Sequence, residues 1–131
     1  MASELRVTTL ANNAGTESVD TTYVINGSAK AWLAFNGTGT IAIKDSNNFT
    51  SISDDGTGDY KSNLTSALSN ANGSATAGGG HPSGLTNVGE SIQVGMLSSS
   101  QLSHESGSTT ANIDFAHLNA AVHLSLIHIS E

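Results

Sequence analysis

The chain has 131 residues, a length typical of one domain that buries roughly two thirds of the surface its unfolded form exposes. Lys and Arg number 4 against 11 Asp and Glu, which gives a formal net charge of -7. Nucleic acid is therefore not an expected partner, because few cations are present to replace the counterions of a phosphate backbone. The absence of cysteine excludes a disulfide scaffold, a thiolate metal site and a cysteine nucleophile.

The composition favours strands over helices. Ser, Thr, Asn and Gly make up 60 of the 131 residues, and hydrophobic residues, at 37%, fall in short blocks between turn-forming residues. No window sustains a helical period of apolar residues. The sequence predicts an all-β fold, a single antiparallel β-sandwich or small barrel-like domain of about seven or eight short strands with an N-terminal arm.

Residues 1–22 are predicted to form the arm or linker and residues 23–123 the β-sandwich domain. Leu5 to Leu10 alternates apolar and polar residues, which indicates a short strand or an arm that adds to another sheet. Asn12 to Asp20 reads as a polar linker with Gly15 as its hinge. Neither a secretory signal within Met1 to Leu10 nor a membrane span is expected, because no apolar run is long enough.

The segment from Lys30 to Leu64 is predicted to be a meander of three or four antiparallel strands. Lys30 to Phe35 has the composition of a central strand, and the Asn-Gly pair in Asn36 to Thr40 favours a tight hairpin turn. Thr40 to Lys44 follows as a strand. Asp54 to Asp59, with sequence DDGTGD, is predicted to form the next turn.

The second half carries weaker signals. Ser69 to Asn87 is Gly-rich and is predicted to be a long loop, either a binding loop or a flexible surface excursion. Strands are predicted over Ser91 to Leu97, Ala111 to Phe115 and Asn119 to His123. Gly107 is expected to mark a turn before the last two strands.

The final segment, residues 124–131, interrupts the polar rhythm with the apolar sequence LSLIHISE. It resembles a translation of the transposase-end adapter used to build sequencing libraries. We therefore expect a non-native tail, with the true C-terminus missing, and exclude it from folding arguments together with His128.

Candidate chemistry is sparse. The three carboxylates within DDGTGD superficially suggest a calcium site, but EF-hand spacing is absent, and a hairpin turn is the favoured interpretation. His81, His104, His117 and His123 do not have the spacing of a metal site. No motif of a hydrolase or metalloprotease is present. We expect no catalytic residues, no metal and no cofactor.

Trp32, the single tryptophan, has two interpretations. An exposed indole could stack on a sugar ring, whereas a tryptophan at the start of a strand is more often part of the core. Its apolar neighbours Ala31, Leu33 and Phe35 favour the core position.

The segment from Lys30 to Tyr60 resembles virion structural or tail-fibre-like proteins of marine tailed bacteriophages, of the cyanophage type. The resemblance covers about 31 residues, and the chain differs from the family pattern at Leu33, Ala34 and Leu64. We call the residues that carry it the motif residues: Lys30, Ala31, Trp32, Phe35, Asn36, Gly37, Thr38, Gly39, Thr40, Asp54, Gly56, Thr57, Gly58, Asp59 and Tyr60. Ile43, Asp45 and Ile52 add to the match.

The resemblance implies a non-enzymatic structural component of a tailed-phage virion, either tail-fibre-like or a head decoration subunit. Further copies of the chain are expected partners, because six aromatic residues make a lean core that neighbouring copies can complete, and a trimer is the favoured form. Other virion proteins and a glycan or receptor of the host surface are also expected. The expected location is the virion. The alternative from another class is a carbohydrate-binding or adhesin β-sandwich module of a bacterial surface protein.

Overall fold

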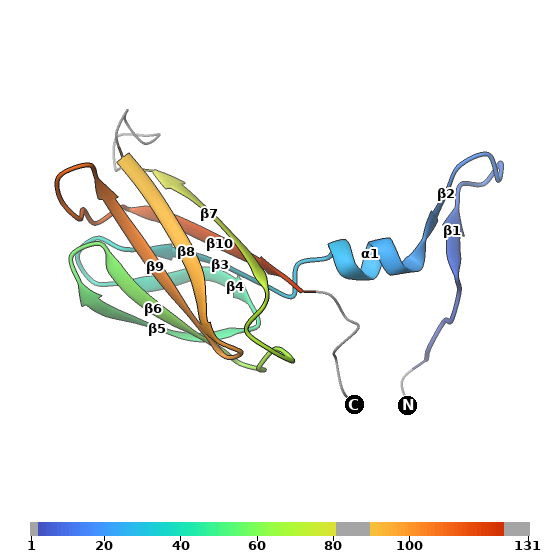
Figure 1. Ribbon diagram of the computed structural model, residues 1–131, viewed down its shortest axis with the longest axis horizontal. Coiled ribbons are helices and arrows are strands. Elements are labelled where there is room, and N and C mark those ends of the chain that lie inside the picture. Colours follow the sequence, from blue (N-terminus) through green and yellow to red (C-terminus); the bar gives the residue numbers. More distant parts are fainter. Residues whose placement is uncertain (1–2, 81–89, 125–131) are drawn as a thin grey trace.

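The computed structural model describes residues 3–80 and 90–124 as an eight-stranded antiparallel sandwich and an N-terminal arm that projects from it (Figure 1). The strands of the sandwich are β3 (Ala31–Asn36), β4 (Ala42–Asn47), β5 (Phe49–Gly56), β6 (Asp59–Leu64), β7 (Ser74–Gly80), β8 (Glu90–Ser98), β9 (Gln101–Ser108) and β10 (His117–His123). The structure therefore confirms the predicted all-β class.

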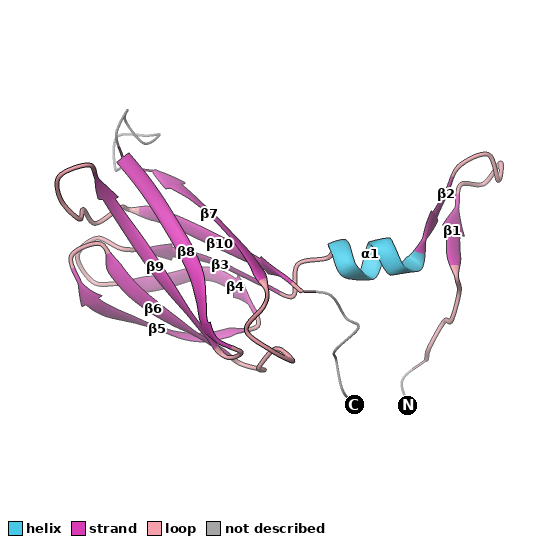
Figure 2. Cartoon of the chain, viewed as in Figure 1, coloured by secondary structure: helices cyan, strands magenta, loops and turns pink. Residues whose placement is uncertain are grey.

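The eight strands form two sheets of four, in the orders β4-β3-β10-β7 and β5-β6-β9-β8 (Figure 2). Neighbouring strands are antiparallel throughout both sheets. The two sheets stack as open layers and do not close into a barrel, so the sandwich is the correct one of the two predicted architectures. In the first sheet β3 lies between β4, which follows it directly in sequence, and β10, which is the last strand of the chain.

The core lies between the inner faces of the sheets. On β3 the inward residues are Ala31, Leu33 and Phe35, and on β10 every second residue is likewise buried. This alternation follows from the two-residue period of a strand. The ring of Phe35 meets the ring of Tyr60 edge to face, with centroids 5.3 Å apart, and so connects the two sheets at the centre of the core.

The meander predicted over Lys30 to Leu64 is wrong in one respect, because the chain changes sheet at Asn48. Asn48 has a positive φ of 61°, which turns the chain out of β4 and into β5. Its side-chain amide donates to the carbonyl of Ser66 at 3.0 Å, and its side-chain oxygen accepts from the Ser66 amide at 2.8 Å. The segment therefore forms two hairpins in opposite layers.

The hairpin predicted at Asn36 to Thr40 joins β3 and β4, but five residues separate the strands, so the turn is wider than the predicted two-residue turn. The Asn36 side chain spans the loop, donating to the Thr38 carbonyl at 2.6 Å and accepting from the Thr38 hydroxyl at 2.9 Å. The positive φ falls on Gly39, at 63°, rather than on the Asn-Gly pair.

The strand β9 was not predicted, and the strand predicted over Ala111 to Phe115 is absent from the structure. That segment is a loop that folds back on β9, where the Ile113 amide donates to the Ser106 carbonyl at 3.0 Å. Gly107 is buried within β9 and does not mark a turn. The inward residues of β9 include His104 and Ser106, and these polar residues concealed the alternation on which a strand prediction depends.

The long loop predicted over Ser69 to Asn87 is also corrected. Residues 74–80 form the edge strand β7, which pairs with the whole of β10. Three consecutive glycines end this strand, and glycine is depleted in strands, so the sequence argued against it. Residues 81–89, with His81, lie outside the described residues.

The arm consists of a small hairpin and one helical segment. Strands β1 (Thr9–Ala11) and β2 (Ser18–Asp20) pair with each other, and helix α1 (Thr21–Gly27) leads toward the sandwich. Of the strand predicted over Leu5 to Leu10, only Thr9 and Leu10 belong to a strand, because β1 begins at Thr9 and continues to Ala11. The predicted polar linker contains β2, and Gly15, with φ of 68°, lies in the hairpin turn.

Helix α1 is stabilised by hydrogen bonds at both of its ends, although its residues have a low helix propensity. Asp20 caps it by accepting from the Thr22 amide at 2.7 Å, and hydrogen bonding from the Thr22 side chain and amide lowers the pKa of Asp20. At the other end the Ser28 amide and hydroxyl both donate to the Val24 carbonyl. No helix in the described part of the chain has the length and apolarity needed to cross a membrane.

His104 is a polar residue in the centre of the core. Its side chain is 2% exposed, and its ring contacts Phe35 edge to face with centroids 5.3 Å apart. Nε2 lies 2.6 Å from the Ser62 hydroxyl, which satisfies both buried polar groups. Burial lowers the pKa of His104 from 6.5 to about 4, because a charged ring would lose its hydration.

This burial predicts a loss of stability in mild acid. The unfolded chain binds a proton at His104 near pH 6.5 and the folded chain only near pH 4, so the stabilising difference is complete above pH 6.5 and declines as the pH falls toward 4. We expect the free energy of unfolding to be about 2 kcal/mol lower at pH 5 than at pH 8 through this residue alone.

Urea unfolding of the wild type and of His104→Gln at both pH values measures this contribution. Glutamine can keep the hydrogen bond to Ser62 but does not titrate, so the variant should show a smaller change between pH 8 and pH 5. Equal changes in the two proteins would show that His104 does not link folding to protonation.

Candidate functional site

The motif residues lie along the whole of β3 and at the end of the sandwich where β3 and β5 finish. Lys30 directly precedes β3, which contains Ala31, Trp32, Phe35 and Asn36. The loop after β3 contains Gly37, Thr38, Gly39 and Thr40, and the hairpin of β5 and β6 contains Asp54, Gly56, Thr57, Gly58, Asp59 and Tyr60. The structure brings these two groups together through the side chain of Tyr60.

Hydrogen bonds around the Tyr60 hydroxyl link the loop after β3, the β5–β6 hairpin and the segment before β10. The hydroxyl oxygen lies 2.9 Å from the Gly37 carbonyl oxygen and 2.7 Å from the Asp114 carboxylate, and its single proton is shared between these two acceptors. The same carboxylate oxygen accepts from the Gly58 amide at 2.7 Å. Tyr60 itself is fully buried, and burial together with Asp114 raises the pKa of its hydroxyl well above the usual value. The hydroxyl therefore serves as a structural donor.

Two motif glycines leave room for these contacts. A Cβ atom at Gly37 would lie 2.5 Å from the Tyr60 hydroxyl oxygen. Gly58 has a φ of 66°, and a Cβ atom there would lie 2.1 Å from the Ser106 carbonyl oxygen. Gly37 and Gly58 thus allow close backbone contacts at this end of the sandwich, which gives these two motif residues a structural role.

The turn predicted over Asp54 to Asp59 is present but narrower, since β5 continues to Gly56 and β6 begins at Asp59, and two of the carboxylates stabilise this hairpin. Asp54 accepts from the Gly56 amide at 3.0 Å, and Asp55 pairs with Lys61, which lowers the pKa of Asp55. Within residues 3–80 and 90–124 no group of three or more histidine, cysteine, aspartate or glutamate side chains is placed to hold a metal ion.

The histidines considered as ligands are dispersed. His104 is inside the core, and His117 is at the start of β10, where its Nδ1 lies 2.6 Å from the Nζ of Lys44. His123 ends β10, six residues further along the same strand. The buried pair of Ser62 and His104 has the spacing of a nucleophile and a base, but both side chains face the closed core.

Trp32 is not in the core, and the sequence interpretation that favoured burial is wrong. Its side chain is 38% exposed and lies on the outer face of its sheet. The reason is the strand period, because Ala31, Leu33 and Phe35 alternate with Trp32 and therefore face the other way. The same period was a signal available in the sequence.

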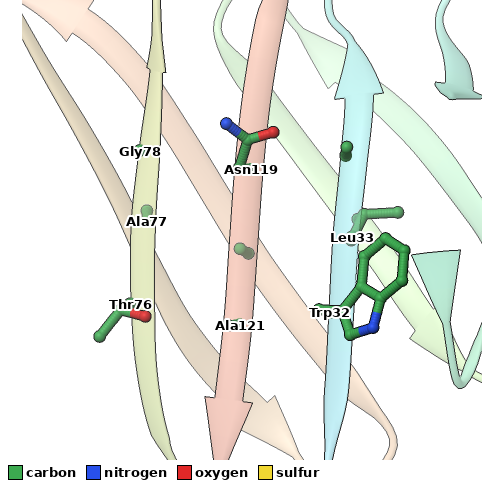
Figure 3. Close-up of a pocket in the computed structure, with 9 residues that line it drawn as sticks. Trp32, Leu33, Thr76, Ala77, Gly78, Asn119 and Ala121 are labelled. Atoms are coloured by element: carbon green, nitrogen blue, oxygen red, sulfur yellow. The ribbon is translucent and has the colours of Figure 1, made fainter. Parts of the chain in front are cut away.

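Trp32 borders a shallow hollow of about 260 Å³ that crosses three strands, β3, β10 and β7 (Figure 3). Small residues give the hollow its depth. Ala34 lies beside Trp32 on β3, Ala121 lies opposite Trp32 on β10, and Gly78 lies opposite Asn119 on β7. Asn119 and Thr76 supply polar groups at its border. Sequence reasoning missed these residues because they come from strands that are far apart in the chain.

The other unusual surface is the arm. Seven of the nine large apolar residues that are exposed in the described chain belong to it: Leu5, Val7, Leu10, Val19, Tyr23, Val24 and Ile25. Leu5 is 82% and Tyr23 75% exposed. A second hollow is lined by residues of the arm alone, among them Leu5, Leu10 and Ile25. Apolar surface concentrated in this way is typical of an interaction site.

The structure thus defines an antiparallel β-sandwich with an apolar N-terminal arm. Comparisons with protein-family models, with curated proteins and with solved structures found no match to this chain.

The glycine contacts predict different costs for two similar substitutions. Gly39→Ala forces alanine into a left-handed backbone conformation, since Gly39 has a φ of 63°. The added Cβ atom itself meets nothing, because no atom lies within 4 Å of its position. Gly58→Ala imposes the same backbone strain and also forces the Ser106 carbonyl aside. We expect Gly39→Ala to cost about 1 kcal/mol and Gly58→Ala about 2 kcal/mol more, measured by urea unfolding. Equal costs for the two variants would contradict this packing.

Proposed function

We propose that this chain is a non-enzymatic structural component of a tailed-phage virion, tail-fibre-like or a head decoration subunit. In this proposal the arm docks the subunit, and the sandwich faces outward and contacts the host surface. The chain would form homo-oligomers, with a trimer favoured, and would bind other virion proteins. The resemblance of the segment from Lys30 to Tyr60 to phage virion proteins supports the class of protein. The exposed apolar residues of the arm support the mode of assembly.

The observation that carries this proposal is the division of the chain into a closed sandwich and an open arm. The sandwich buries its inward residues between two sheets. The arm leaves most of its large apolar side chains in water, although burial of one such side chain is worth about 1.5 to 3 kcal/mol. A partner that covers the arm would gain this energy, and other copies of the chain present the same surface.

A carbohydrate-binding or adhesin module of a bacterial surface protein is the second candidate. The exposed Trp32 beside the hollow favours it, because sugar-binding surfaces use aromatic rings. The two candidates differ in their genetic context. Sequencing outward from this reading frame in the parent DNA should find portal, capsid or tail genes for a virion subunit, whereas adhesin or polysaccharide genes would overturn the virion proposal.

Assembly through the arm predicts the mass of the protein in solution. The wild type should have three times the chain mass of 13.3 kDa, or about 40 kDa, by size-exclusion chromatography with light scattering. The double variant Leu10→Glu, Ile25→Glu should be monomeric, because two unpaired carboxylates would have to be buried in the interface.

Leu97→Glu is the matched control. Leu97 is 51% exposed and lies on β8 of the sandwich, away from the arm in sequence, so its substitution should leave the trimer mass unchanged. Circular dichroism of both variants should match the wild type. A monomeric wild type, or a double variant of unchanged mass, would overturn assembly through the arm.

A further inference from the structure

We propose that the outer face of the sheet β4-β3-β10-β7 binds a neutral saccharide of the host envelope, with one sugar ring against Trp32. This inference rests on the proposed host contact and names its site and its ligand. The face combines three features that saccharide recognition needs: an exposed aromatic ring, neutral hydrogen-bonding groups that are not used within the protein, and a hollow lined largely by alanine and glycine.

The aromatic ring is positioned by the strand period and bordered by a small residue. Trp32 has Asn47 opposite it on β4 and Ala121 opposite it on β10. Alanine is too small to cover an indole, and the hollow begins on that side. One face of a hexopyranose consists of C–H groups, which can pack against an exposed aromatic ring.

The polar groups around Trp32 are free to bind a ligand. Asn47, Asn119 and Thr76 are exposed, and in the described chain their side chains make no hydrogen bond. Each amide offers both a donor and an acceptor, which matches the hydroxyl groups of a sugar. Neighbouring strands are about 4.8 Å apart, so the face from β3 to β7 spans about 10 Å, enough for a short oligosaccharide.

The charges on this face favour a neutral sugar over an acidic one. Asp45 is exposed and lies opposite Ala34 on the same outer face, and the whole chain carries a net charge of -7. The nearest cation in sequence is Lys30, whose Nζ contacts the Ile25 carbonyl. The Nζ of Lys44 likewise already contacts the Ala116 carbonyl at 2.7 Å and His117. A carboxylate or sulfate on the ligand would therefore be repelled.

A protein is a less suitable occupant. Interfaces between proteins have an apolar centre with several large side chains. Among the described residues of the sandwich, only Trp32 and Leu97 are large, apolar and exposed, and Leu97 belongs to the other sheet. One tryptophan within a polar face fits a sugar better than it fits a protein partner.

The single tryptophan provides a direct measurement, because all tryptophan fluorescence comes from the proposed site. The intact protein would be screened on an array of neutral and acidic glycans. It would then be titrated with the neutral disaccharides cellobiose, maltose, lactose and chitobiose, with sialyllactose as the acidic comparison. Concentrations up to about 10 mM detect dissociation constants in the millimolar range. We expect at least one neutral glycan to bind and to change the emission.

Two variants test the location by calorimetry with the glycan that binds best. Trp32→Ala removes the ring, and Gly78→Gln fills the hollow from a position where a Cβ atom has nothing within 4 Å. Both should weaken binding at least tenfold. Gly95→Gln is the matched control, because Gly95 is also an exposed strand glycine with open space around its Cβ position, but in the other sheet.

Three glycan-binding results would overturn the proposal: binding of acidic glycans only, full binding by Gly78→Gln, or no response to any neutral glycan. Capture of a protein at this face instead would also overturn it. The mass of the assembly is an independent measurement on the arm. Failure of glycan binding with an intact trimer would therefore reject this inference and leave the assembly proposal in place.

Discussion

The buried hydroxyl of Tyr60 is the contact on which the end of the sandwich depends. It joins the loop after β3, the hairpin between β5 and β6, and the connection before β10, through Gly37, Gly58 and Asp114. These connections belong to both sheets, so their relative position is fixed by one polar group in a region that excludes water. A buried hydroxyl that lost its acceptors would cost about 1 to 3 kcal/mol. Glycine at position 37 is a consequence, because a Cβ atom there would lie 2.5 Å from the Tyr60 hydroxyl oxygen.

The core has an unusual amount of polar surface for its size. Inward positions on β6 and β9 carry Ser62, His104 and Ser106, where aliphatic residues would give a larger apolar area. Each is paired, since Ser62 contacts His104 and the Ser106 hydroxyl donates to the Ile113 carbonyl at 2.7 Å. Among the described residues no buried side-chain nitrogen or oxygen lacks a partner. Paired polar groups specify the register of two layers, but they contribute less to stability than apolar burial does. Assembly through the arm would supply further apolar burial.

The sequence predicted the fold class and the strands with clear alternation, and its errors have physical causes. Strands β3, β8 and β10 were predicted because apolar residues recur at every second position. Strand β9 was missed because its inward side chains are polar, and β7 was missed because glycine and alanine carry no pattern. Helix α1 was missed because β-branched residues dominate it, and only its capping residues signalled it. Of the candidate surface, Trp32 could have been placed outward from its neighbours, whereas Asn119 and Thr76 required knowledge of strand order.

The two exposed surfaces follow from the same limit on what this chain can bury. A sandwich has two inner faces, and both are filled by the alternating residues of eight strands. A large apolar residue at an outward position, such as Trp32, cannot be accommodated inside without a shift of register that would expose Leu33 and Phe35.

The arm has no second layer at all, since β1 and β2 form a two-stranded hairpin, which has marginal stability alone in water. An exposed tryptophan on a well-formed sheet can bind a ligand without reorganisation. The arm, in contrast, would bury apolar surface only against a partner, which is why we propose the rigid surface for recognition and the arm for assembly.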